Sequence, residues 1–371
     1  MASIAIPGNG FADAAASPGT HARDLLLRRL ADLAVLPAGH ITPQERGLVD
    51  MVMATAVSRL DEAQRRRLAE RVAMLPEGPR ELTLALARDK FFVAEPLLGL
   101  SVSLSPGDLV GILRDTGPEH AFAIAGRRSL PHAVVEALIE HGNARGICRM
   151  LANPGATISA TAIETLTRRS ASEPEFVPLL LCRPELTARL ALLMFWWSPA
   201  ATRSEILTRF TVERRMMHVA LGDVLEAGLA ASGDDEPLRA VLSLVSPPRL
   251  APKSHLVQFG HLASSGHGED FLAALAQAGR VRQETMFRIV NDIGGEPLAV
   301  FAKAIGLARA EFGDLTVHAA SIRGGTVPSR GDIERNVAVF DALSIDRADL
   351  VLHSWDWLLS NEAQIAMPDD L

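Results

Sequence analysis

The histidines between residues 255 and 267 are the side chains whose type most suggests metal chemistry. His255, His261 and His267 precede Glu269 and Asp270, and imidazole and carboxylate groups are ligands that zinc and iron accept. Ligands on one helix face are three or four positions apart, whereas His255 and His261 are six apart. We interpret the three histidines as surface residues at helix ends, with a metal site as the alternative, and predict no metal and no cofactor.

A second candidate is the turn formed by Asn291-Asp292 and Gly294-Gly295. Phosphate-binding turns follow a β-strand and open a helix with several glycines. No strand pattern precedes this turn, so we interpret it as the end of one helix and the start of another at Glu296. The nucleophile pattern G-x-S-x-G is also absent, and no catalytic residue is predicted.

The cysteines and the apolar stretches indicate in which cellular compartment the protein is expected. Cys148 and Cys182 are the only cysteines, too few for a disulfide framework and wrongly spaced for a metal knuckle. The N-terminus lacks the basic and apolar regions of a signal peptide. The apolar stretch at residues 190–197 is far shorter than the ~20 residues that cross a bilayer. The sequence therefore predicts a cytoplasmic protein without membrane insertion.

Composition favours helices. Among 371 residues, 48% are apolar, 5% are aromatic and none is Tyr, so Ala and Leu, which are good helix formers, supply most of the core. The net charge is −7, and residues 80–200 carry 12 basic and 12 acidic side chains. This balance argues against nucleic acid as a partner. The sequence thus predicts an all-α protein.

Four apolar residues mark an internal repeat. Leu104, Leu130, Ile158 and Leu186 each follow the end of an apolar helical pattern, with spacings of 26, 28 and 28. Residues of helix-start type come next: Ser105-Pro106, Pro131, Ser159 and Thr187. Helix pairs this short bury their apolar faces by stacking on one another. We expect an α-solenoid-like stack of short HEAT-like repeats whose four marker residues belong to the core.

The repeats suggest five segments. We predict a flexible tail at residues 1–20, an N-terminal helical bundle at 21–78, the short helical repeats at 79–200, a C-terminal helical domain at 201–360, and a flexible tail at 361–371.

A weak partner surface is predicted at Arg127, Arg183, Phe91, Trp196 and Trp197. Each arginine lies three residues before a marker leucine, where it either caps a helix C-terminus or forms part of a polar ladder lining a partner groove. The aromatic residues lie at the edges of the repeat region. They either pack in the core or form an exposed patch for a partner.

The runs LAERVAMLPEGPRELTLALARDKFFVAEPLLGL, LANPGATIS, LLCRPEL and MFRIVNDIGGEPLAVFAKAIGLARAEFGDL resemble the bacterial domain of unknown function numbered 2336. They are also similar to the wider class of HEAT-like and leucine-rich-variant helical repeats. The resemblance implies an α-helical, solenoid-like fold. It implies no activity and transfers no catalytic residue.

Two classes of function follow. The first is a non-enzymatic adaptor or regulatory scaffold that binds an unidentified protein partner through the repeat surface, because stacked repeats present extended surfaces. The alternative is a small-ligand sensor or an enzyme with a pocket between the repeats and the C-terminal helices. A homo-oligomer formed through the N-terminal helices stays open.

Overall fold

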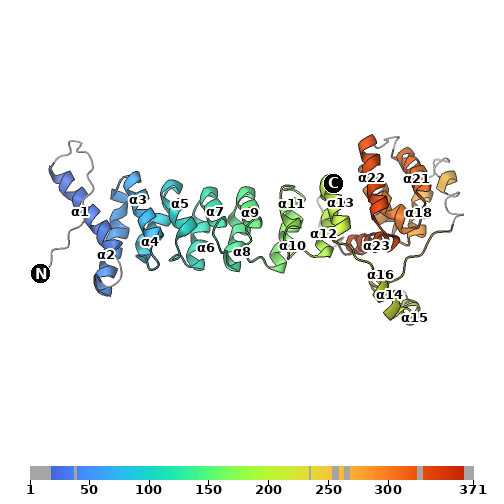
Figure 1. The fold of residues 1–371 in the computed structure, drawn as a ribbon, viewed down its shortest axis with the longest axis horizontal. Helices are drawn as coiled ribbons and strands as arrows, with labels where there is room; N and C mark the ends of the chain where they lie inside the picture. Colours follow the sequence, from blue (N-terminus) through green and yellow to red (C-terminus); the bar gives the residue numbers. More distant parts are fainter. Residues whose placement is uncertain are drawn as a thin grey trace. The chain divides into compact units, whose positions relative to one another are not determined.

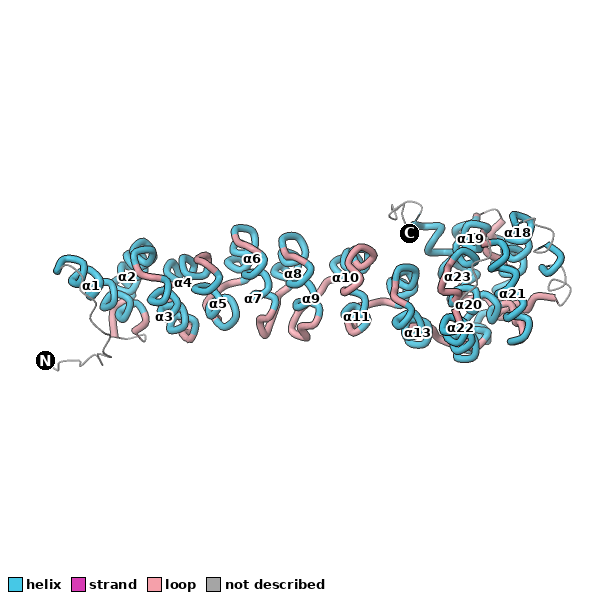
Figure 2. The backbone as a smooth tube through the Cα atoms, turned by 90° about the horizontal axis from the view of Figure 1, so that it is seen from above, coloured by secondary structure: helices cyan, strands magenta, loops and turns pink. Residues whose placement is uncertain are grey.

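The computed structural model describes residues 18–36, 40–233, 235–252, 259–262, 268–323 and 329–362. Within these ranges every regular element is a helix and no β-strand occurs, as Figure 2 shows. The predicted all-α class is therefore confirmed. No helix among the described residues combines the length and the apolar character needed to cross a membrane.

The chain divides into two compact units, Met1–Ser159 and Ala160–Leu371. We refer to them as unit 1 and unit 2. The five segments predicted from the sequence stay a prediction. Helix α1 begins at Pro18 and helix α23 ends at Glu362, so these helices extend a few residues into the segments predicted as tails.

Unit 1 contains α1 (Pro18–Ala34), α2 (Pro43–Ala56), α3 (Glu62–Ala73), α4 (Arg80–Ala87), α5 (Phe91–Leu100), α6 (Pro106–Asp115), α7 (Pro118–Ala125), α8 (His132–His141) and α9 (Ala144–Leu151). Helix α3 packs on α5, α5 on α7 and α7 on α9, while α6 packs on α8. Figure 1 shows the odd-numbered helices from α3 to α9 in one row and α4, α6 and α8 in a second row. Successive helices of the odd-numbered row therefore contact one another, and α6 contacts α8 in the other row.

The predicted helix starts are observed. Ser105 accepts a hydrogen bond from the backbone N–H of Asp108, whose carboxylate accepts from Ser105 N, and Pro106 follows at the first helical position. Thr42 and Glu45 form the same reciprocal pair at the start of α2. These bonds satisfy backbone donors that a helix N-terminus leaves without intrahelical partners. In unit 1, α6 and α8 therefore begin directly after the predicted start residues Ser105 and Pro131.

The three marker residues of unit 1 are buried, as predicted. Leu104, Leu130 and Ile158 expose 6% or less of their surface. Leu130 also pairs by its backbone with residues 155–157: its N–H donates to Gly155 O at 2.9 Å, and its carbonyl accepts from Thr157 N at 3.0 Å. Leu130 is thus held both by its buried side chain and by main-chain hydrogen bonds to the segment that precedes α10.

Unit 2 contains α10 (Ala160–Arg169), α11 (Phe176–Leu181), α12 (Ala188–Met194), α13 (Ala200–Arg209), α14 (Arg215–Leu221), α15 (Leu225–Ala231), α16 (Glu236–Ser243), α18 (Gly268–Gly279), α19 (Gln283–Asn291), α20 (Glu296–Ala304), α21 (Arg309–Ile322), α22 (Arg330–Ala342) and α23 (Ile345–Glu362). Helix α23 packs on α12, α16, α19 and α20. Leu186, the fourth marker residue, is buried just before α12. Helix α23 is therefore the element around which much of unit 2 packs.

A buried ionic cluster joins α23 to the start of α14. Arg214 is 2% exposed and donates to Asp346 at 2.7 Å and to Asp349 at 2.9 Å. Arg280 approaches the other oxygen of Asp349 at 3.2 Å. His353 lies one turn further along α23, and burial lowers its pKa below the ordinary value. Removing one member would leave a buried charge without compensation, which is costly.

Replacing Leu130 by Ala tests the role of the marker positions. The side chain is fully buried, so its truncation should lower the free energy of unfolding by about 2 to 5 kcal/mol. Urea unfolding measures this change. The matched control is Leu100→Ala, because Leu100 is 64% exposed. Equal and small effects of the two substitutions would contradict a core role for Leu130.

Candidate functional site

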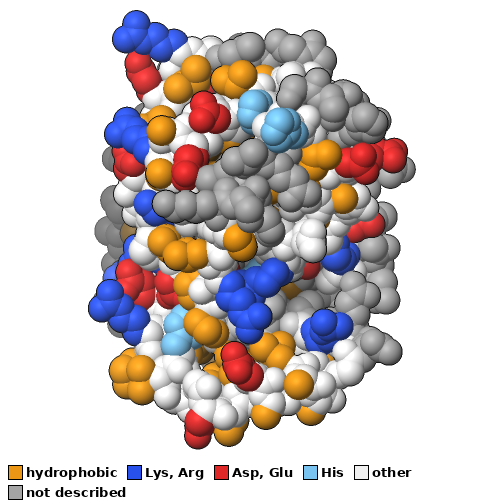
Figure 3. All heavy atoms as spheres, turned by 90° about the vertical axis from the view of Figure 1, so that its right-hand side faces the viewer, with side chains coloured by type: hydrophobic (Ala, Val, Ile, Leu, Met, Phe, Trp, Pro, Cys, Tyr) orange, Lys and Arg blue, Asp and Glu red, His pale blue; other side chains and the backbone are white. Residues whose placement is uncertain are grey.

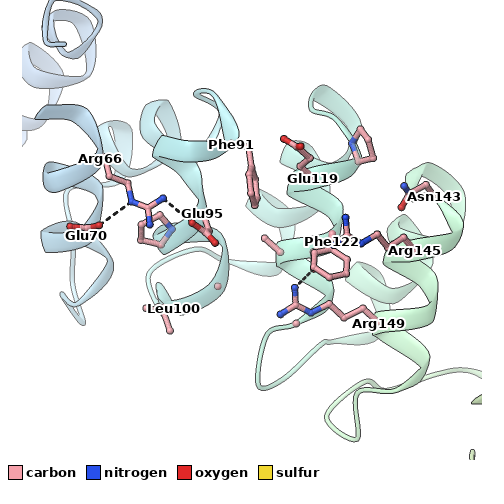
Figure 4. Close-up of a pocket in the computed structure, with 15 residues that line it drawn as sticks. Arg66, Glu70, Phe91, Glu95, Leu100, Glu119, Phe122, Asn143, Arg145 and Arg149 are labelled. Atoms are coloured by element: carbon pink, nitrogen blue, oxygen red, sulfur yellow. Dashed lines mark hydrogen bonds and ion pairs between the residues drawn. The ribbon is translucent and has the colours of Figure 1, made fainter. Parts of the chain in front are cut away.

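A groove of about 750 Å³ lies on the row of odd-numbered helices in unit 1. Helices α3, α5, α7 and α9 and the turns beside them supply its lining: Arg66, Glu70, Phe91, Glu95, Pro96, Gly99, Leu100, Pro118, Glu119, Phe122, Ala123, Gly126, Asn143, Arg145 and Arg149. Figure 4 shows these side chains. The groove runs across successive helices because the equivalent helices of neighbouring pairs lie side by side.

Phe122 on α7 is held between two arginines of α9. The guanidinium carbons of Arg145 and Arg149 lie 4.1 and 4.3 Å from the centre of its ring, within the range of cation–π attraction. Arg149 Nη1 also donates to the backbone carbonyl of Phe122 at 3.1 Å. Arg145 and Arg149 are four positions apart on one helix, so both reach the same ring.

Gly126 gives Arg149 its place. A Cβ atom built on Gly126 would lie 2.2 Å from Arg149 Nη2 and 2.4 Å from Cζ. Any other residue at this position would therefore push the guanidinium away from Phe122. The glycine that ends α7 thus fixes the geometry of the basic side of the groove.

The two arginines of α9 have no carboxylate within ion-pair distance among the described residues. Glu119 lines the groove on α7, yet no ion pair joins it to either arginine. Asn143 uses its Oδ1 to accept from Gly146 N at 2.9 Å, which leaves its amide NH₂ as a further donor. This end of the groove therefore offers several hydrogen-bond donors and two positive charges to an anionic group.

At the other end of the groove the arginine is already paired with carboxylates of the protein itself. Arg66 on α3 pairs with Glu70 at 2.9 Å and with Glu95 at 2.8 Å. The hydrogen bonds that Arg66 donates to Glu70, and then to Glu95, raise the pKa of Arg66. Apolar surface lies between the two ends, including Phe91 and the exposed side chain of Leu100. The groove therefore combines an apolar middle with one basic end.

The structure places Arg127 at a helix C-terminus, one of the two roles predicted for it. Its guanidinium donates to the carbonyls of Leu98 at 2.7 Å and Ser101 at 2.6 Å. These carbonyls belong to the end of α5, so Arg127 caps α5. Burial lowers the pKa of Arg127. Asn153 repeats this interaction one repeat later, since its amide donates to the carbonyls of Ala125 and Arg127.

The other predicted surface residues differ in placement. Phe91 is half-buried and belongs to the groove, with its ring centre 5.8 Å from that of His120. Arg183 is 6% exposed and pairs with Glu185 at 2.7 Å. Arg183 therefore presents little surface to a partner.

The two tryptophans lie in unit 2. Trp196 is 7% exposed, and its ring centre lies 4.9 Å from that of Trp355. Trp197 is half-buried and donates from Nε1 to Ser170 at 2.8 Å. Both tryptophans therefore pack inside unit 2, which is one of the two roles predicted for the aromatic residues.

Sequence reasoning missed Phe122, Gly126, Arg145 and Arg149. A usable signal existed, because Arg145 and Arg149 have helical spacing and Arg149 follows Phe122 by 27 residues, which matches the repeat period. Equivalent positions one period apart lie side by side in stacked repeats. Comparing residues that lie one repeat period apart, in addition to residues close in sequence, would have brought these four residues together.

The metal and phosphate candidates from the sequence can be compared with the described residues. His255 and His267 lie outside the described residues. Among the residues that the structure describes, no group of three or more His, Cys, Asp and Glu side chains could hold a metal ion. Helix α19 ends at Asn291 and α20 begins at Glu296, so the glycines between them join two helices.

The described residues thus define an all-helical protein with a groove on a row of short helices. The chain matches, over residues 93–353, the family described as an uncharacterised protein conserved in bacteria (DUF2336). The match covers more than half of the chain, so the chain belongs to this family, as the sequence resemblance indicated. No curated protein and no solved structure shows significant similarity to it.

Replacing Arg127 by Ala tests its capping role. The change removes hydrogen bonds to two carbonyls at the end of α5, and a lost charged hydrogen bond costs roughly 1.5 to 3 kcal/mol. Thermal and urea unfolding should both show the loss. Arg128→Ala is the control, because that neighbouring side chain is exposed. A variant as stable as the control would contradict the capping role.

Proposed function

We propose that this protein is a non-enzymatic cytoplasmic adaptor or regulatory scaffold that binds a protein partner through its helical repeats. In this proposal unit 1 is an α-solenoid-like stack of short HEAT-like repeats. The packing of α3, α5, α7 and α9 in one row supports it, because stacked repeats form extended binding surfaces. The groove on this row is the proposed docking site.

The partner segment is proposed to be an amphipathic peptide that carries carboxylates. The observation that carries this proposal is Phe122 between Arg145 and Arg149, two cations without a carboxylate partner among the described residues. Paired arginines bind carboxylates through charge-assisted hydrogen bonds. Leu100 and Phe91 supply apolar surface beside them, which suits the leucine-type side chains of such a peptide.

Charge distribution supports a peptide over nucleic acid. The groove holds both arginines and glutamates. Figure 3 views a different face, the right-hand side of Figure 1, where acidic and basic side chains are also interspersed. Nucleic-acid surfaces instead concentrate positive charge. An acidic peptide needs only the local basic end formed by α9.

Binding of a synthetic peptide tests the proposal. The probe is a fluorescein-labelled helical peptide with leucines on one face and glutamates on the other. Arg145→Glu combined with Arg149→Glu should weaken its binding at least about tenfold, equivalent to 1.4 kcal/mol. Fluorescence anisotropy measures the change. Binding should also weaken when Gln replaces Glu in the peptide, because the carboxylates then lose their charge.

Matched variants make this result specific. Arg114→Glu changes an exposed arginine on α6, which lies in the other row of helices, and should leave binding unchanged. Gly126→Ala should weaken binding because it displaces Arg149. Equal affinity for the Glu and Gln peptides, or equal loss in the Arg114 variant, would refute the proposed docking site.

A small-ligand sensor is the second candidate function. An apolar groove of about 480 Å³ lies between α21 and α22 in unit 2, and Phe312, Val317, Ile333 and Val337 contribute to its lining. Grooves of this size and character accept small apolar molecules. This groove lies within unit 2, whereas the sequence suggested a pocket between the repeats and the C-terminal helices.

A blocked variant tests the second candidate. A Cβ atom on Gly313 meets no other atom within 4 Å, so Gly313→Leu should fill the groove without unfolding α21. Thermal-shift measurements with medium-chain fatty acids and alcohols should show a concentration-dependent rise in melting temperature for the unmodified protein. The Gly313 variant should lose that rise. No rise with any of these compounds, or the same rise in the variant, would exclude them as ligands of this groove.

A further inference from the structure

Helix α2 has an apolar stripe that its own unit leaves exposed. Leu48, Met51 and Val52 are 59%, 57% and 37% exposed, and their spacing places them on one helix face. The opposite face of α2 carries Asp50 and Met53, which are buried. Asp50 accepts hydrogen bonds from the N-terminal amides of α4. Helix α2 thus has one face bound to unit 1 and a second apolar face without cover among the described residues.

Helix α1 adds to this surface. It packs on α2 and buries Leu27 and Ala31, yet Leu25 and Leu26 are 46% and 58% exposed and Leu33 is 37% exposed. Helices that carry an apolar stripe opposite their buried face are usually packed between neighbours on both sides. Helices α1 and α2 have this pattern. We call Leu25, Leu26, Leu33, Leu48, Met51 and Val52 the N-terminal apolar face.

The size of this face matches a symmetric pair. At these exposures the six side chains present on the order of 500 Å² per chain, so two copies would bury about 1,000 Å², near the lower limit for a specific interface. A two-fold axis brings the same face of both copies together, which makes a patch of this kind self-complementary.

The charges beside the face also suit a second copy. Arg29 is exposed on α1 and Glu45 is exposed on α2, so a two-fold arrangement can bring opposite signs together. A partner surface with charges of only one sign would be attracted by one of these two side chains and repelled by the other. The helices themselves supply the matching geometry, since two helical pairs with apolar stripes can pack as a four-helix bundle.

We propose that two copies of this chain associate through the N-terminal apolar face, with α1 and α2 of each copy forming a four-helix bundle. The groove of each copy stays separate from this face, because it is built from α3, α5, α7 and α9. A dimer therefore carries two docking grooves and can bind a partner with two acidic segments more tightly than either groove alone.

Light scattering of the full chain after size-exclusion chromatography tests the inference. At tens of micromolar the unmodified protein should have twice the chain mass of 39.7 kDa. Leu48→Glu combined with Val52→Glu should raise the dimer dissociation constant at least tenfold and give a monomer at the same concentration. Leu26→Glu on α1 provides an independent test with the same expected result.

Controls separate association from folding. The stripe residues are exposed, so their variants should keep the helical circular dichroism and the melting behaviour of a folded chain. Val102→Glu changes a side chain that is 72% exposed elsewhere in unit 1 and should leave the dimer intact. A monomeric unmodified protein, or a dimer that persists in both the α1 and the α2 variants, would overturn the inference.

Discussion

Unit 1 depends on one constraint: its helices are so short that they are stable only when they pack against neighbouring helices. Its helices from α4 to α9 have eight to ten residues, whereas isolated helices below about 12 to 15 residues are marginal in water. These helices are therefore held by packing on neighbouring helices, for example α5 on α7 and α6 on α8. Hydrogen bonds between repeats add to this packing, since Arg127 caps α5, Asn153 caps α7 and Asp50 binds the start of α4.

The groove is a consequence of the same packing. Because the odd-numbered helices are aligned, residues about one period apart meet on one surface, and Phe122 of α7 reaches Arg145 and Arg149 of α9. Arg149 also donates to the backbone carbonyl of Phe122, but neither arginine has a carboxylate partner among the described residues. Their charges are therefore available at the surface, whereas Arg66 at the other end is already neutralised by Glu70 and Glu95.

Sequence patterns predicted the parts of the fold that depend on local chemistry and burial. Leu130 and its equivalents were recognisable because an apolar residue recurs at a near-constant spacing, and the start of α6 was recognisable because Ser105-Pro106 satisfies helix N-terminal amides locally. Capping by Arg127 was one of two predicted roles, but its target, α5 of the preceding repeat, depends on tertiary packing. The site at Phe122 was missed because its partners Arg145 and Arg149 are exposed residues of another helix, and only the offset of Arg149 from Phe122, close to the 26-to-28-residue spacing of the marker residues, pointed to the contact.

Hydrogen–deuterium exchange of the full chain, with and without a saturating Leu/Glu amphipathic peptide, tests the central claim most directly. The account predicts slower exchange on peptide addition in α5, α7 and α9, because these helices line the apolar middle and the basic end of the groove. Helices α6 and α8, in the other row, should show little change. Protection confined to unit 2, or protection of both rows of unit 1 alike, would contradict a docking groove on the odd-numbered helices.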